Sequence, residues 1–184
     1  MISALTFAEN ALLLKWDKFK YSDLDCQAFV EAVLKDIGVR KPDGSLYNWK
    51  GSNSMYRNFY TWRGTYQEAI NKFGFLPVGS FAYINKPWGT EKPTYNDDLG
   101  NCSHVGIYCG NGIVRDSTRS TKTKRDGVGS RPLEDFNRFS LFSGLDYSGT
   151  NNYNDYVTWI LESISRIRKE LERMETEIYE IIRN

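Results

Sequence analysis

The sequence is poor in the residues that build metal and disulfide sites. It has one histidine among 184 residues, which excludes a metal site built on several histidines. Its three cysteines include no C-x-x-C pair and no zinc-ligand spacing. Three cysteines are also too few for a disulfide framework, and an odd number cannot all form pairs. We therefore expect neither a metal nor another cofactor.

The sequence also lacks an excess of charge of one sign and any long apolar run. The formal net charge is +1, so the composition gives no electrostatic reason to expect nucleic-acid binding. No stretch approaches the roughly 20 apolar residues that span a membrane. Residues 1–7 carry no Lys or Arg, and the apolar run at residues 11–14 is short for a signal peptide. We expect no membrane span and no signal peptide.

The apolar pattern predicts one compact α+β domain over residues 1–147. Apolar residues at helical spacing, followed by Gly38, predict a helix that begins at Cys26. The pattern also predicts strands at residues 80–84, 103–109 and 113–117, with a Gly-Asn-Gly turn between the last two. Short helices are expected within residues 4–16 and 53–73, and a polar loop over residues 118–131.

Residues 148–184 are expected to form a separate C-terminal helix. Its apolar residues alternate at spacings of three and four: Val157, Ile160, Ile164, Ile167, Leu171, Met174, Ile178 and Ile181. This repeat is typical of a coiled-coil seam, and isoleucine at both core positions favours three or more strands. Residues 157–181 therefore predict a homo-oligomer, with a trimer favoured. The alternative is an amphipathic helix folded back on its own domain.

Cys26 and His104 have the placement of a catalytic pair. Cys26 opens the predicted helix, where backbone N–H groups and the helix dipole favour a thiolate and can stabilise an oxyanion. His104 begins a predicted strand far downstream and is the only imidazole base in the chain. Each residue has an ordinary alternative, because cysteine is often a small core residue and a lone histidine is often structural. Cys102 and Cys109 are interpreted as structural.

Asp116 is the candidate that would orient His104. If the Gly-Asn-Gly turn is a three-residue hairpin loop, Gly106 faces Asp116, which then lies diagonal to His104 on one face of the sheet. A two-residue loop would turn Asp116 to the opposite face and present Arg115 and Ser117 instead. The final glycine of the turn favours three residues. An aspartate in this place accepts a hydrogen bond from one ring nitrogen and directs the other toward the thiol.

Three stretches resemble the NlpC/P60 family of cell-wall cysteine peptidases. Residues 25–30, DCQAFV, resemble the D-C-S-G-(F/L)-V motif of that family. Residues 76–81, LPVGSF, resemble its L-x-P-G-D-(L/V) stretch, and residues 104–112, HVGIYCGNG, are similar to its H-V-G-I-Y-x-G-N-G hairpin. The resemblance covers about residues 10–147.

The resemblance implies a papain-like fold, in which a helix carrying the cysteine packs on a central antiparallel sheet carrying the histidine. It implies a peptidoglycan hydrolase that cuts the stem peptide between D-γ-glutamyl and a diamino acid. Cys26 matches the nucleophile of the family and His104 its base. Asp116, twelve residues after His104, matches the third polar residue. Tyr21 is the best match to a tyrosine that assists at the oxyanion, and Asp25 is expected to meet the substrate amine.

Gln27 stands where the family has serine, and we expect it to contact the substrate. Ala28 and Ser80 stand where the family pattern has a glycine and an aspartate, so the resemblance does not decide which bond is cut. An N-acetylmuramoyl-L-alanine amidase with the same triad is one alternative. A non-catalytic phage structural or wall-binding module is another. We expect a protein made in the cytoplasm that reaches the cell wall after lysis, as an endolysin does, or on a phage-like particle.

Overall fold

The computed structural model describes residues 1–88, 95–121, 124–150, 168 and 171–174. The chain divides into two compact units, residues Met1–Asn151 and Asn152–Asn184. In the second unit, residues 168 and 171–174 are helical, and most of the predicted coiled coil over residues 157–181 lies outside the described residues. Within the described residues, no helix is both long and apolar enough to cross a membrane.

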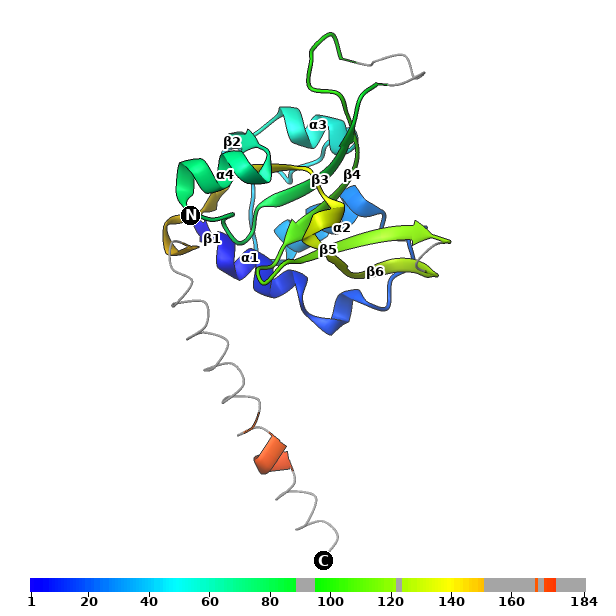
Figure 1. Ribbon diagram of the computed structural model, residues 1–184. Coiled ribbons are helices and arrows are strands. Elements are labelled where there is room, and N and C mark those ends of the chain that lie inside the picture. The colour runs from blue at the N-terminus through cyan, green and yellow to red at the C-terminus, as the bar shows by residue number, and fades with distance from the viewer. Residues whose placement is uncertain (89–94, 122–123, 151–167, 169–170, 175–184) are drawn as a thin grey trace, which may run out of the picture. The chain divides into compact units, whose positions relative to one another are not determined.

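The first unit contains helices and strands in mixed order (Figure 1). The helices and 3-10 turns are α1 (Ala4–Ala11), η1 (Leu14–Trp16), α2 (Cys26–Asp36), α3 (Ser52–Arg57), α4 (Tyr66–Phe73), η2 (Leu133–Asp135) and η3 (Ser148–Thr150). The strands are β1 (Ile2–Ser3), β2 (Tyr60–Gly64), β3 (Phe81–Lys86), β4 (Asn101–Tyr108), β5 (Ile113–Ser120), β6 (Arg125–Pro132), β7 (Arg138–Phe142) and β8 (Leu145–Asp146).

A six-stranded antiparallel sheet forms the centre of this unit, in the order β2-β7-β3-β4-β5-β6. β1 and β8 form a separate two-stranded parallel sheet. The prediction of an α+β domain is confirmed. β5 pairs with β6 over its whole length but with β4 only at the pairs Ile107↔Arg115 and Tyr108↔Val114. β5 and β6 therefore extend beyond the rest of the sheet as a ribbon (Figure 1).

Apolar side chains cover both faces of the sheet. Val105 and Ile107 of β4 belong to a cluster with buried residues of α1 and α2. Val114 of β5 and Phe139 of β7 belong to a second cluster with Ala69 of α4. The alternation of side chains along a strand explains this division, because successive residues point to opposite faces.

α2 is the helix that positions Cys26. The carboxylate of Asp25 caps its N-terminus by accepting the N–H of Ala28 at 2.8 Å. The helix ends at Asp36, shortly before Gly38 with a φ of +81°. Its apolar face is buried, and each of its large side chains stabilises the fold by roughly 1.5–3 kcal/mol: Phe29, Val30, Val33 and Leu34. The predicted helix is confirmed, and it packs against β4 and β5.

One predicted segment is wrong. Residues 118–131, expected to be a polar loop, continue β5 to Ser120 and form most of β6. The stretch has few apolar side chains, but the ladder between β5 and β6 uses backbone groups and needs no apolar pattern. The short helices expected within residues 53–73 are confirmed as α3 and α4, and a strand that was not predicted, β2, lies between them.

Candidate active site

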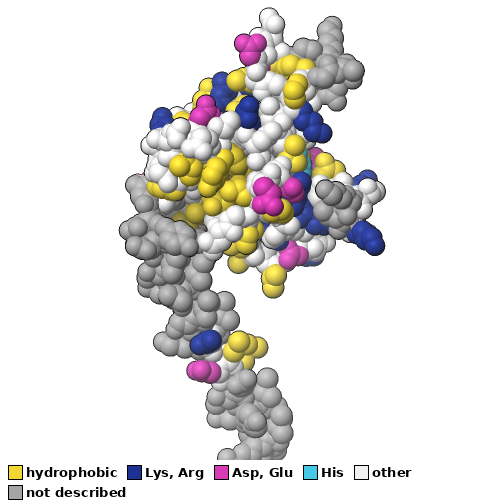
Figure 2. All heavy atoms as spheres, viewed as in Figure 1, with side chains coloured by type: hydrophobic (Ala, Val, Ile, Leu, Met, Phe, Trp, Pro, Cys, Tyr) yellow, Lys and Arg dark blue, Asp and Glu magenta, His cyan; other side chains and the backbone are white. Residues whose placement is uncertain are grey.

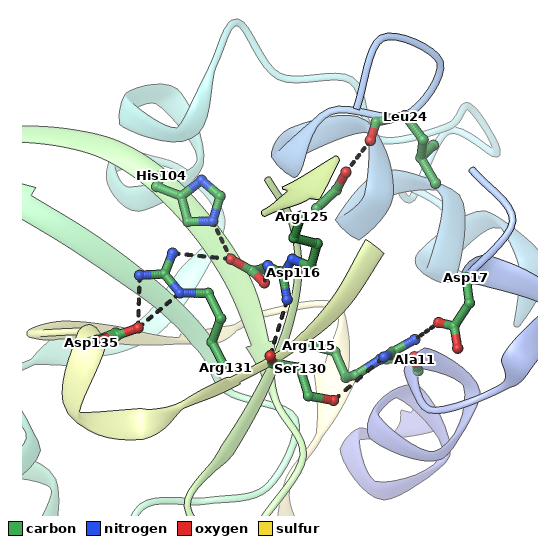
Figure 3. Close-up of polar contacts among 11 residues, drawn as sticks. Ala11, Asp17, Leu24, His104, Arg115, Asp116, Arg125, Ser130, Arg131 and Asp135 are labelled. Carbon is green, nitrogen blue, oxygen red and sulfur yellow. Dashed lines mark hydrogen bonds and ion pairs between the residues drawn. The ribbon is translucent and has the colours of Figure 1, made fainter. Parts of the chain in front are cut away.

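The hairpin between β4 and β5 has the three-residue register. Ile107 pairs with Arg115, and the N–H of Cys109 donates to the carbonyl of Ile113 at 2.9 Å. A Cβ placed on Gly106 would lie 3.0 Å from the Cβ of Asp116, so the two residues face each other as predicted. Arg115 points to the other face, where it donates to the carbonyl of Ala11 (Figure 3). The hydroxyl of Ser117, on the same face, donates to the carbonyl of Leu24.

His104 and Asp116 meet beyond the last pair between β4 and β5. Nε2 of His104 donates to Oδ2 of Asp116 at 2.5 Å (Figure 3). Asp116 is fully buried, and His104 is 9% exposed. The ring of His104 also packs 6.2 Å from the ring of Phe136, centroid to centroid. The side chain that was predicted to orient the histidine therefore does contact it.

Cys26 completes the contact from the N-terminus of α2. Its thiol lies near enough to the side chain of His104 to raise the pKa of the ring, through a hydrogen bond and through its charge. Since Nε2 of His104 is held by Asp116, Nδ1 is the ring nitrogen left for the thiol. The three residues predicted as a triad thus form one chain of side-chain contacts, assembled from α2, β4 and β5.

The pKa of His104 reflects opposing influences. Burial acts against the charged imidazolium, but the hydrogen bonds to Asp116 and Cys26 and the charges of both partners outweigh it. Together they raise the pKa of His104 from 6.5 to about 9. At neutral pH the ring of His104 is therefore protonated.

Two arginines of β6 hold the carboxylate of Asp116. Nη2 of Arg125 donates to Oδ1, and Nη1 of Arg131 lies 3.3 Å from Oδ2 (Figure 3). Arg131 is itself paired with Asp135 at 2.9 Å and lies over the ring of Phe136, 5.1 Å from its centre. A buried carboxylate without partners would be costly, and two guanidinium groups offset that cost.

Sequence reasoning missed these two arginines because it predicted a loop at this place. A period-two pattern was available to find them: Arg125, Gly127, Gly129 and Arg131 alternate along the chain and so share one face of a strand. Gly129 lies opposite Asp116 in the ladder. A Cβ at Gly129 would come within 2.7 Å of the Arg125 side chain, so the glycine makes room for the guanidinium.

Tyr21 reaches Cys26 from the segment that precedes α2. Burial comes first among the causes that raise the pKa of Tyr21 above 10, followed by the charges of Cys26 and Asp25 and a hydrogen bond to Cys26. The segment is fixed against β6, because a Cβ on Gly127 would lie only 2.1 Å from the carbonyl oxygen of Phe19. The predicted assisting residue is thus in contact with Cys26, the predicted nucleophile.

The two residues predicted to bind substrate both have contacts within the protein. Asp25 is exposed, and one of its carboxylate oxygens caps α2. The side-chain amide of Gln27 donates to Glu31 at 2.8 Å and to the carbonyl of Trp49 at 2.7 Å, and its oxygen accepts the N–H of Gly51 at 2.5 Å. Their contacts with a substrate stay predictions.

The other two cysteines lie away from this chemistry. Burial raises the pKa of the Cys102 thiol to about 11 and that of the Cys109 thiol to about 12. Both residues are almost completely buried. Their interpretation as structural residues fits these surroundings, because a buried thiol with a raised pKa is a poor nucleophile.

An apolar hollow adjoins the ring that packs against His104. Figure 2 shows hydrophobic side chains gathered beside α4 on this face of the molecule. A hollow of about 360 Å³ in the first unit is lined by Tyr66, Leu133, Phe136 and Phe139, among others. Phe136 is thus shared between the hollow and the surroundings of His104.

Comparisons with known proteins assign no family to the chain. No protein-family model matches the sequence, and no curated protein matches it significantly.

Proposed function

We propose that the chain is a papain-like cysteine hydrolase of the NlpC/P60 type that cleaves peptidoglycan stem peptides. The observation that carries this proposal is the chain of contacts from Tyr21 through Cys26 and His104 to Asp116. A helix-N-terminal thiol, an imidazole and a buried carboxylate in this order are the parts needed for nucleophilic acyl transfer. The three sequence stretches similar to the family supply the substrate class.

In this proposal the thiolate of Cys26 attacks the carbonyl carbon of the scissile amide. The N–H groups of the first turn of α2 and the hydroxyl of Tyr21 stabilise the resulting oxyanion. The imidazolium of His104 gives its proton to the leaving amine, and the C–N bond breaks to leave a thioester on Cys26. His104 then takes a proton from water, which attacks the thioester. The C–S bond breaks, the carboxylic acid is released, and the thiolate of Cys26 is restored beside the imidazolium. Asp116 keeps the ring oriented through both steps.

We favour the bond between D-γ-glutamyl and a diamino acid as the one that is cut. The amidase stays a second candidate function because of the residue at position 27, Gln27. The family has serine at this place, whereas the amide of Gln27 is engaged with Trp49, Gly51 and Glu31. A contact with the substrate from this position therefore has no direct counterpart. The same nucleophile and base can also cleave the amide between the muramoyl group and L-alanine.

The test is digestion of purified peptidoglycan by the wild-type protein and by Cys26→Ala, with mass spectrometry of the products. We expect fragments that are absent with the variant. A new amine on the diamino acid identifies the endopeptidase, and free stem peptides that begin with L-alanine identify the amidase. If neither protein releases fragments from several wall types, the proposal is wrong, and a non-catalytic wall-binding module takes its place.

A further inference from the structure

We propose that Gln27 is a positioning residue that fixes Cys26 relative to His104 through the segment of residues 49–53. Gln27 follows the nucleophile directly, and the segment contacts β4 two residues before the base. The inference rests on the proposed function for its kinetic consequence, but its structural consequence can be measured without any substrate. The role differs from the substrate contact that the sequence predicts for Gln27.

The first end of this connection is the first turn of α2. The amide oxygen of Gln27 accepts the N–H of Gly51 at 2.5 Å, and its nitrogen donates to the carbonyl of Trp49 at 2.7 Å. The carboxylate of Glu31, one turn later, accepts from the same nitrogen at 2.8 Å and from the N–H of Trp49 at 2.7 Å. Both amide hydrogens of Gln27 are therefore used inside the protein.

The other end of the connection is the start of β4. The hydroxyl of Ser52 donates to the carbonyl of Cys102, and Oδ1 of Asn53 accepts the N–H of Cys102 at 2.7 Å. Nδ2 of Asn53 also donates to Oδ1 of Asn101 at 2.8 Å. Both backbone groups of the fully buried Cys102 are thus held by α3. Because Cys102 precedes His104 by two residues, these bonds fix the strand where it carries the base.

The segment between the two ends is itself anchored. The ring of Trp49 is 5% exposed and packs edge-on against Phe81 and Phe142, with centroids 6.3 and 5.6 Å apart. Gly51 has a φ of +90°, a conformation that residues with a side chain disfavour. It lies directly before α3 and so joins the residues bound by Gln27 to that helix. A displacement of about 1 Å between reacting groups can cost about a hundredfold in rate, so such a connection bears directly on the chemistry.

The charged groups around His104 make the position of Cys26 measurable. Two of these groups contact the ring itself, Cys26 from α2 and Asp116 from β5. The others contact those two or their partners: Arg125 and Arg131 from β6, Asp135 from η2, and Tyr21 beside the thiol. The chain has a single histidine, so its ring signals in a nuclear magnetic resonance spectrum belong to His104 without further assignment. The pKa of His104 therefore reports on its contact with Cys26.

The test compares Gln27→Met, which keeps the length of the side chain and removes its hydrogen bonds, with the matched change Gln67→Met. The amide of Gln67 is exposed on α4 and donates only to Asn71 among the described residues, at 2.9 Å. We expect Gln27→Met to lower the pKa of His104 by roughly 1 unit, toward the value in Cys26→Ala, and Gln67→Met to leave it unchanged. In the double variant with Gln27→Met and Cys26→Ala, the pKa of His104 should be the same as in Cys26→Ala alone.

Kinetics give the second readout. If the protein hydrolyses peptidoglycan, we expect Gln27→Met to lower kcat by about 10- to 100-fold with little change in KM. Should Gln27→Met fail to fold, Ser52→Ala interrupts the other end of the connection, and the same lowering of the pKa of His104 is expected. A wild-type pKa in both folded variants would overturn the inference. A wild-type protein without hydrolase activity would overturn the proposed function alone, since the titration needs no substrate.

Discussion

Raising the pH from 6.5 to 9 should destabilise the folded protein through His104. The pKa of His104 is about 9 in the folded protein and 6.5 in a solvated chain, so the folded protein binds this proton more tightly. The stabilising contribution is fully present below pH 6.5, declines as the pH rises and is lost above about pH 9. The difference between the two pKa values of His104 corresponds to a loss of about 3 kcal/mol in the free energy of unfolding.

The measurement is urea denaturation at several pH values between 6 and 9.5, on the wild type and on His104→Gln. The variant keeps a side-chain amide that can donate to Asp116, and Arg125 and Arg131 still hold this carboxylate. Cys102 and Cys109 also ionise more readily in the unfolded chain near the upper end of this range, but both proteins carry them, so their effect cancels in the difference. We expect the difference between the two proteins to shrink by about 3 kcal/mol as the pH rises.

Parallel curves for the two proteins would refute this reasoning. They would mean that His104 titrates in the folded protein as it does in water, and that its contacts with Asp116 and Cys26 do not favour the imidazolium. A difference that grows with pH would have the opposite sign and would show that burial dominates.

Three further predictions concern the neighbours of His104. Iodoacetamide at pH 7 should modify Cys26 well ahead of Cys102 and Cys109, as peptide mass mapping would show. If the protein hydrolyses peptidoglycan, Tyr21→Phe should lower kcat by about a hundredfold while the circular dichroism spectrum is retained, because the change removes the proposed oxyanion donor. Arg131→Gln should lower the free energy of unfolding by about 1–3 kcal/mol in urea denaturation, since it removes one partner of a buried carboxylate.

Arg119→Gln is a matched control for the change at Arg131. Arg119 pairs with Asp126 at 3.3 Å on the surface, where its side chain is 61% exposed. Such pairs contribute about 0–1 kcal/mol, so the control should have little effect on stability. Equal losses for the two arginines would contradict the role given to Asp116 as a buried charge that needs both guanidinium groups.

The local parts of the site could be predicted from the sequence. The helix of Cys26 follows from apolar spacing between a capping aspartate and a glycine, and all three signals lie within a few residues of one another. The position of Gly106 opposite Asp116 follows from the length of the turn, because loop length sets the register of a hairpin. These features depend on neighbours in the chain and need no knowledge of the rest of the fold.

The surroundings of the site could not be predicted in the same way. The contacts of Arg125 and Arg131 depend on β6, whose ladder is made by backbone groups that leave little trace in an apolar pattern. The amide of Gln27 finds its partners in an irregular segment more than 20 residues away. The difference between Gln27 and the serine of the pattern that the sequence resembles gave no indication of these contacts.

The pairing of β1 with β8 brings the first and last strands of the first unit together. Ile2 lies beside Leu145 and Ser3 beside Asp146, while the sequence between them makes up nearly the whole unit. A domain whose ends are neighbours tolerates having those ends joined and new ones opened in an exposed loop. The order of Cys26 before His104 along the chain is therefore not a requirement of the site itself, and a circularly permuted protein that carries the histidine first would present the same side chains.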